Sequence, residues 1–284
     1  LFGTSDMGQG ARTVFAQVVA EELGIPMERI SVISGDTATV PYDQQTSASR
    51  STVLMGNAVL RACGDINGQV ARMAARQYGV AEDDVSARGG VVRMTNEEIP
   101  ADEVIRAALG ALGGELSGKG EMRKEVVPGH PLSGTVSFYE FNCTAVEVEV
   151  DGETGETRVL RHVSVGDAGK MLNPSQAAGQ DEGAAVMGIG HALMEYLILD
   201  EAGRVRNLGA VDYRIPTIKD MPDELVSASI ENGDGPGPYG SKGISEGSLL
   251  CVAPAVAAAI RDATGAVLHD LPMTPERVWA ALQK

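Results

Sequence analysis

The sequence has few cysteines and no cysteine pairs, which excludes several kinds of metal protein. Its 284 residues contain three cysteines, Cys63, Cys143 and Cys251. They are widely separated and lack the Cys-x-x-Cys spacing that iron–sulfur and zinc sites use. The histidines show no metal-ligand spacing either; they are His130, His162, His191 and His269. We therefore expect no protein ligand to a metal, and three buried free thiols in a reducing compartment.

Positive charge and long apolar runs are also scarce. Lysine and arginine total 23 against 39 aspartates and glutamates, which gives a formal net charge of -16. This charge argues against binding to nucleic acid or to an anionic membrane surface. No apolar run approaches the roughly 20 residues that span a bilayer, and the amino terminus has no signal-peptide pattern. The sequence predicts a soluble, cytoplasmic protein with a small-molecule substrate, no nucleic-acid partner and no membrane span.

Hydrophobic residues make up 43% of the chain, which is enough to bury a core. In some segments they recur at the spacing of a helix, and in others at every second residue, as in a strand. Helical spacing predicts helices at 14–23, 53–78, 101–112, 248–264 and 275–282, with a further helix after Asn173-Pro174. Period-two alternation predicts a hairpin at 144–150 and 157–165, strands at 30–34, 91–94 and 225–230, and a second hairpin around 201–204. This mixture predicts an α+β fold with mixed sheets and packed helices.

Composition shifts near the middle of the chain. Residues 113–120 are glycine-rich and indicate a flexible connector, and a second break follows at Pro128 to Pro131, around His130. We therefore predict two interlocked subdomains, residues 1–120 and residues 121–284. Because the first residue is Leu1 rather than Met, we also expect the chain to be trimmed or to be part of something larger.

Two turn-rich segments precede predicted helices. One is Met7-Gly8-Gln9-Gly10, and the other is Thr46 to Thr52, in which small residues surround Arg50. Free amides at a helix start bind anions, and an arginine adds a charged partner. For Met7 to Gly10, a capped surface helix is the favoured alternative, because so short a glycine motif is weak evidence of binding. For Thr46 to Thr52, a helix cap of serines and threonines with a solvated Arg50 explains the pattern about as well.

A third glycine-rich segment, Gly235 to Gly247, runs directly into the apolar stretch 249–260. Its five glycines and two prolines form a backbone that can pass close to a ligand. Glu246 falls where the helix cap is expected. A carboxylate there either favours the helix dipole or acts as a functional group, and the local sequence does not decide between the two.

Taken together and in order, these motifs resemble the molybdenum hydroxylase (xanthine oxidase) family. The resemblance covers essentially the whole chain and corresponds to the C-terminal half of the family's molybdopterin-binding subunit. Any one motif is weak, whereas the ordered set is specific. The motifs are Met7 to Gly10, Thr46 to Thr52, Glu147 to Asp151 with Thr154-Gly155, Asp167 to Gly169 with Asn173-Pro174, Gly179-Gln180, Gly188 to Gly190, Asp212-Tyr213 with Ile215-Pro216, Gly240 to Gly243 with Glu246, and Leu271-Pro272 with Thr274-Pro275.

The resemblance implies a cofactor and a set of site residues. The cofactor is molybdopterin with molybdenum, in its cytosine dinucleotide form, and the pterin rather than the protein holds the metal. The cofactor-binding residues implied are Met7, Gly8, Gln9, Ala48, Ser49, Arg50, Ser51 and Gln180. Glu246 matches the family's general base in hydroxylation of an electron-poor carbon, of an N-heteroaromatic compound or an aldehyde, with oxygen from water. We expect Gln9, Ser49 and Gln180 to converge with Glu246 on one cleft.

The local structure around Glu246 decides two questions: whether Ser245 is strained, and whether Lys242 faces Glu246. The family usually has glycine at the position of Ser245, so a left-handed backbone there would strain this residue. Partial burial is expected to raise the pKa of a general base, and Lys242 would oppose that shift if it faced Glu246.

The resemblance also implies partners, because the family's other domains have no counterpart in this sequence. We expect a subunit with the first half of the molybdenum domain, an iron–sulfur subunit, and a flavin subunit carrying FAD. The alternative is a noncatalytic cofactor-binding or assembly subunit of such a complex. A metal-free, glycine-rich nucleotide-binding protein remains a third interpretation, which depends only on the local motifs.

Overall fold

A computed structural model describes residues 1–110, 113–123 and 138–284 of the chain. The predicted break at Pro128 to Pro131, with His130, lies outside these residues. The chain forms two compact units. Unit 1 contains Leu1–Phe138 and Gly233–Gly243, and unit 2 contains Tyr139–Asn232 and Ile244–Lys284. Both combine helices with a small sheet, so the predicted α+β class is confirmed. The assignment of 1–120 and 121–284 to two cradle subdomains stays a prediction.

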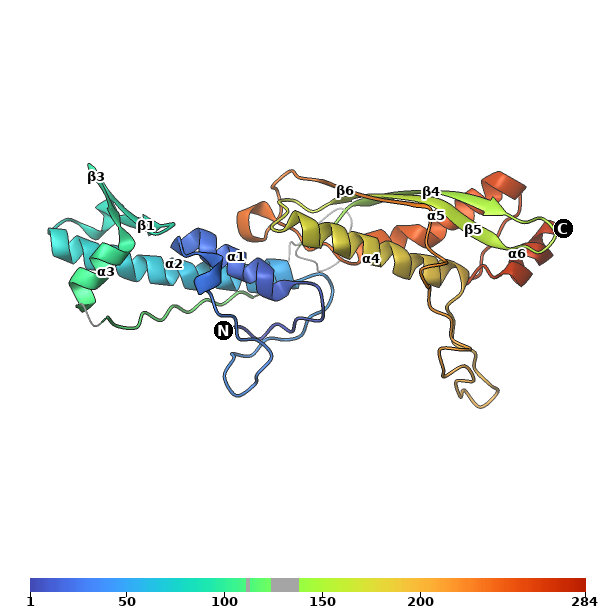
Figure 1. Cartoon of the computed structure of the whole chain (residues 1–284), viewed down its shortest axis with the longest axis horizontal. Helices are drawn as coiled ribbons and strands as arrows, with labels where there is room; N and C mark the ends of the chain where they lie inside the picture. The colour runs from blue at the N-terminus through green and yellow to red at the C-terminus, as the bar shows by residue number, and fades with distance from the viewer. Residues whose placement is uncertain (111–112, 124–137) are drawn as a thin grey trace. The chain divides into compact units, whose positions relative to one another are not determined.

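Two helices form the frame of unit 1 (Figure 1). Helix α1 spans Ala11–Leu23 and ends at Gly24, whose left-handed backbone returns its amide to the carbonyl of Ala20. Helix α2 spans Ser51–Tyr78 and ends in the same way at Gly79. The predictions at 14–23 and 53–78 are therefore confirmed, with each helix starting two or three residues earlier than expected. Near its start, unit 1 buries Phe2 against Phe15, whose rings meet edge to face at 5.0 Å.

A three-stranded antiparallel sheet and a short helix cover the far end of α2. The strands are β1 (Ser86–Arg88), β2 (Val91–Met94) and β3 (Glu97–Pro100), and α3 spans Ala101–Leu109. Only β2 and α3 are predicted from sequence, because the strands on either side have three and four residues and little alternation. Val70, Val92 and Val104 form the buried core here. Two single-turn 3-10 helices, at Met27–Arg29 and Glu82–Asp84, complete this part of the unit.

The strand predicted at 30–34 is wrong. This segment makes one isolated parallel bridge, between Phe2 and Ser34, and is otherwise irregular. Its alternating side chains have no neighbouring strand to pair with in the described part of unit 1. The hairpin predicted around 201–204 is likewise reduced to one bridge, between Leu199 and Val205 in unit 2.

Unit 2 is a mixed sheet with helices packed on it. Strand β4 (Asn142–Val150) and β5 (Thr157–Asp167) form the predicted hairpin, with a bulge at Glu147/Val148. Strand β6 (Glu224–Ile230) then pairs parallel to β5, so β5 is the central strand. Helices α4 (Pro174–Leu193) and α5 (Gly247–Thr264) pack on this sheet and on each other, as Figure 1 shows. Helix α6 spans Pro275–Leu282, as predicted.

Helix α5 is the central element of the unit 2 core. By length and composition it is the one helix in the described residues that is long and apolar enough to cross a membrane. Its residues Val252, Val256 and Ile260 are fully buried in the same cluster as Ile189 of α4, so this face of the helix is already covered by protein. A Cβ at Gly188 would lie 2.6 Å from the Cβ of Val252, which explains why α4 has glycine at this contact.

Candidate active site

The first candidate loop, Met7 to Gly10 in unit 1, is held by its own side chains. The amide of Arg12, ahead of those of Gly8 and Gly10, bonds the carboxylate of Asp6 and lowers its pKa. Gln9 accepts from the amide of Met7 at 2.6 Å and donates to the carbonyl of Ser5 at 2.8 Å. Gly8 has a φ of 110° and open space where a side chain would be. The loop is thus fixed from within and has room above its backbone.

The second candidate loop leads into α2 and has a strained backbone. Ala48 and Ser49 have φ values of 54° and 50°, an unusual conformation for residues other than glycine. Arg50 is the N-cap of α2 and donates to the side chain of Gln44 at 2.7 Å and to the carbonyl of Gln45. This arginine is therefore held within its loop rather than simply solvated.

The two loops are joined in unit 1. Thr46 donates its hydroxyl proton to the carbonyl of Ser5 at 2.9 Å, and that carbonyl also accepts from Gln9. Seven of the eight predicted cofactor residues are therefore carried by two connected loops; they are Met7, Gly8, Gln9, Ala48, Ser49, Arg50 and Ser51. Strained residues held by their surroundings are typical of ligand-binding loops.

The glycine-rich segment supplies a third loop to the same unit. Residues 233–243 belong to unit 1, and Lys242 pairs there with Asp234, with 2.8 Å between Nζ and Oδ1. A Cβ at Gly243 would lie 1.6 Å from the carbonyl oxygen of Ser49, so the two backbones are in direct contact. Only glycine fits at this position.

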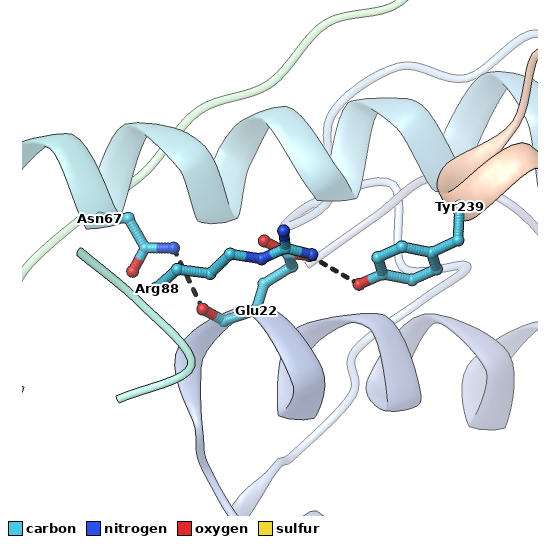
Figure 2. Close-up of polar contacts among 4 residues, drawn as sticks. All are labelled: Glu22, Asn67, Arg88 and Tyr239. Atoms are coloured by element: carbon cyan, nitrogen blue, oxygen red, sulfur yellow. Dashed lines mark hydrogen bonds and ion pairs between the residues drawn. The ribbon is translucent and has the colours of Figure 1, made fainter. Parts of the chain in front are cut away.

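A buried carboxylate anchors this third loop. Glu22 of α1 pairs with Arg88 of β1 at 2.7 Å and accepts the hydroxyl proton of Tyr239 at the same distance. The backbone carbonyl of Glu22 accepts from the side chain of Asn67 on α2. Figure 2 shows the four side chains gathered between the two helices. Burial, ahead of the bond to Glu22, raises the pKa of Tyr239, whose own φ is 57°.

Replacement of Tyr239 by Phe is expected to destabilise unit 1 modestly. The variant keeps the ring but removes one hydrogen bond to a buried carboxylate, which is worth about 1–2 kcal/mol. Glu22 keeps its ion pair with Arg88, so the fold itself is retained. Chemical denaturation of the wild type and the variant measures the loss. Tyr42→Phe is the matched control, because Tyr42 is 90% exposed in the same unit; equal stability of all three proteins would contradict the prediction.

In unit 2, Glu246 lies at the start of α5. It is the N-cap of this helix and its side chain makes no capping hydrogen bond. A carboxylate at this position still suits the positive end of the helix dipole, so the dipole interpretation and the functional one both stay open. Glu246 is exposed, and the burial expected around a general base does not come from the described residues of this chain. Ser245 is not among the residues with positive φ, so serine is tolerated there without strain.

A buried polar cluster, which no sequence pattern predicted, lies beneath this turn. Asp181, next to the predicted cofactor residue Gln180 on α4, accepts from Ser164 of β5 at 3.0 Å and from Ser248 on α5. Asn142 of β4 donates to Ser248 at 2.8 Å. The cluster thus joins α4, both strands of the hairpin and the first turn of α5.

Two further titratable groups belong to the cluster. Burial raises the pKa of Glu140 to about 7, assisted by the nearby charges of Asp181 and Glu246 and opposed by backbone amides of the turn. His162, on β5, is completely buried, and burial lowers its pKa against the attraction of Asp181. Neither ring nitrogen of His162 has a hydrogen-bond partner among the described residues. The sequence signal for Glu140 is one acidic residue between Tyr139 and Phe141, directly before an alternating strand.

The donor set fits an organic cofactor that brings its own metal ligands. The predicted contacts are side-chain amides, hydroxyls, the Arg50 guanidinium, the Met7 side chain and backbone groups, carried by two loops of unit 1 and by α4. In the described part of the chain, no group of three or more His, Cys, Asp or Glu residues has metal-binding geometry. The four side chains predicted to converge on one cleft belong to different units: Gln9 and Ser49 lie in unit 1, whereas Gln180 and Glu246 lie in unit 2. Their convergence stays a prediction.

The cysteines differ from expectation in their burial. All three are free thiols, as predicted, and Cys63 is buried, which raises its pKa to about 11. Cys143 is exposed and Cys251 is half-buried, so the prediction of three buried thiols is wrong. Cys143 is on β4, where alternation places it on the face opposite to the helices.

Comparison with known proteins identifies the family. Residues 1–222 match the model of the molybdopterin cofactor-binding domain. The 6-hydroxypseudooxynicotine dehydrogenase complex subunit gamma of Paenarthrobacter nicotinovorans is 33% identical over 99% of this chain and 35% of its own length. The putative xanthine dehydrogenase molybdenum-binding subunit XdhA of Escherichia coli K12 is 34% identical over 98% of this chain and 36% of its own length. The chain thus spans about a third of these relatives.

Solved structures agree with the sequence matches. The Cu,Mo-CO dehydrogenase in its carbon monoxide reduced state superposes with a TM-score of 0.83 at 25% identity, over 99% of this chain and 35% of that one. Quinoline 2-oxidoreductase from Pseudomonas putida 86 gives a TM-score of 0.82 at 27% identity, over 99% of this chain and 36% of that one. The chain belongs to the molybdopterin cofactor-binding domain family of xanthine dehydrogenase-type molybdenum oxidoreductases.

Proposed function

We propose that this chain forms part of the molybdopterin-binding subunit of a molybdenum hydroxylase and supplies its general base, Glu246. The observation that carries this proposal is the position of Glu246 at the start of α5, where the glycine-rich segment ends and the side chain is exposed. A carboxylate in that state accepts a proton. The substrate is an electron-poor carbon of an N-heteroaromatic compound or an aldehyde, and the oxygen added comes from water.

The loops of unit 1 would hold the cofactor. Met7, Gly8 and Gln9 contact the pterin, and the segment Ala48 to Ser51 lines it and its phosphate or cytosine dinucleotide extension. Free backbone amides at the start of α2 suit a phosphate there. Gln180 adds a contact from α4 in unit 2. The bound cofactor supplies the oxygen-transfer and redox chemistry.

The chain's own chemical step is a proton transfer. The carboxylate of Glu246 accepts the proton lost by the water-derived oxygen as that oxygen bonds to the substrate carbon. The substrate class is supported by relatives named for nicotine, xanthine and related compounds. One of them, the nicotine 6-hydroxylase large subunit of Paenarthrobacter nicotinovorans, is 31% identical over 98% of this chain and 34% of its own length.

Partner subunits are part of the proposal. We assign a subunit carrying the first half of the molybdenum domain, an iron–sulfur subunit and a flavin subunit carrying FAD to the same complex. Exposed apolar side chains on residues 195–223 are consistent with association: this irregular segment follows α4 and contains Leu208, Val211 and Ile218, which are 85%, 86% and 87% exposed. A partner subunit that covered them would remove this apolar surface from water. The free thiols support a cytoplasmic location for the complex.

Metal and pterin analysis of the purified complex tests the proposal. The chain is purified with its native partners, and molybdenum, pterin and hydroxylation of N-heteroaromatic compounds and aldehydes are measured together. We expect one molybdenum and one pterin per chain, with incorporation of labelled oxygen from water into the product. A complex that contains the cofactor but hydroxylates no substrate would support the noncatalytic assembly subunit. A complex without molybdenum or pterin would contradict both interpretations.

A further inference from the structure

Glu140 lies directly beneath the turn that presents Glu246. Its Oε1 is 2.5 Å, and its carboxyl carbon 2.6 Å, from the position that a Cβ at Gly247 would occupy. The carboxyl group thus packs directly against Gly247, and a larger residue at position 247 would have to push it aside. Oε1 is buried without a hydrogen-bond partner among the described residues. A buried oxygen without a partner is costly as a charged group and much less so when the carboxyl group is protonated.

The charges around Glu140 favour the same protonation state. Asp181 faces it from α4 and Glu246 from the turn, and both disfavour a second negative charge. Cys251, on α5, and His162, on β5 and facing Asp181, are the other titratable groups around the cluster in the described residues. The amides of Ser245 and Gly247 donate hydrogen bonds to the carboxyl group, so they tie the turn to Glu140 in either protonation state; because they stabilise the ionised form more, they act against the rise in its pKa. Glu140 is thus placed where a change of protonation acts directly on the turn.

We propose that Glu140 is a positioning residue for Glu246, and that its protonated carboxyl group, seated against Gly247, holds the turn from Ser245 to Gly247 at the start of α5. This inference depends on the proposed role of Glu246 as general base. Glu140 does not touch the substrate in this proposal. It acts on Glu246 through the backbone of the turn and through the repulsion that arises when both carboxyl groups are ionised.

The proposal predicts how stability changes with pH. The pKa of Glu140 is raised from an ordinary 4.5 to about 7, so the unfolded chain releases this proton first as the pH rises. The stabilising contribution of the neutral carboxyl group is therefore complete below pH 4.5 and is lost as the pH rises to about 7. Glutamine imitates the neutral form and cannot ionise, so it removes this dependence.

The test compares Glu140→Gln, Glu140→Ala and the wild type in the purified complex. The fall in melting temperature between pH 5 and pH 8 is expected to shrink by about half or more in Glu140→Gln. Its turnover should lose the inflection near pH 7, with cofactor content unchanged. Glu140→Ala leaves the turn unsupported, and its kcat should fall about 10-fold to 100-fold with little change in KM. Glu149→Gln, which changes an exposed carboxylate of β4, is the matched control and should follow the wild type.

The outcomes separate this inference from the proposed function. If Glu140→Gln keeps both the stability profile and the pH–rate profile of the wild type, the positioning role is wrong even when Glu246→Gln is inactive. If Glu246→Gln is fully active, the base assignment fails. In that case the stability profile of Glu140→Gln still reports whether the buried carboxyl group holds the turn in its protonated form.

Discussion

Turnover of the complex is expected to fall by about 100-fold to 10,000-fold when Glu246 is replaced by Gln, because general-base catalysis contributes a factor of that size. Glutamine has nearly the same volume as glutamate and cannot accept the proton. The substitution removes no side-chain capping hydrogen bond from the start of α5. Molybdenum and pterin content should match the wild type, since the predicted pterin contacts come from other residues. The measurement is kcat and kcat/KM at saturating electron acceptor, with metal analysis of the same preparation.

The control for this experiment is Glu153→Gln, in the turn between β4 and β5. Glu153 is exposed and at a distance along the chain from every predicted site residue, so its variant should retain full activity. A Glu246→Gln complex with bound molybdenum and wild-type turnover would contradict the assignment of the base. If the variant lost both activity and molybdenum, Glu246 would instead be needed to bind the cofactor.

The helices of this chain could be predicted from sequence because their signals are local. Asn173 accepts from the amide of Gln176 at the start of α4, with Pro174 in the first turn, and both features are visible in the sequence. The segment 30–34 shows the opposite case. It has the alternation of a strand, but a strand also needs a partner, and here only Ser34 finds one. Pairing is a property of the fold and is not encoded in the segment itself.

The loops of the predicted cofactor site come from motif order, whereas the contacts that support these loops could not be predicted. Motif order assigns Met7 to Gly10 and Thr46 to Thr52 to that site, which stays a prediction; the structure joins the two segments through Thr46 and Ser5. The buried acids were not predictable. Glu22 meets Tyr239 across 217 positions of sequence, and Asp181 meets Ser248 across 67. No local pattern reports a contact at that separation, so only the fold shows which carboxylates are buried.

The contact between Gly243 and Ser49 also joins residues that are far apart in the sequence. Because of this contact, we expect substitution of Gly243 to have a large effect. Gly243 does not need a left-handed backbone, since it is not among the glycines with positive φ. Its requirement is steric, because the obstructing atom is the backbone carbonyl oxygen of Ser49. Ser49 and Ala48 are already strained, so this segment has little freedom to move aside. A side chain at position 243 must therefore displace either the strained segment or the third loop.

Gly243→Ala is accordingly expected to lower the molybdenum and pterin content of the complex by tenfold or more. Such clashes typically cost about 1–3 kcal/mol, and about 1.4 kcal/mol already corresponds to a tenfold loss of binding. Cofactor content per chain, measured on the purified complex, gives the result. Gly64→Ala in α2 is the matched control: Gly64 lies in the same unit, its added Cβ meets no atom within 4 Å, and alanine favours the helix by about 1 kcal/mol. If Gly243→Ala retained the cofactor as well as Gly64→Ala, the segment from Ala48 to Ser51 would not be part of the cradle. Loss in Gly243→Ala alone supports a cradle whose shape depends on backbone contact between these two loops.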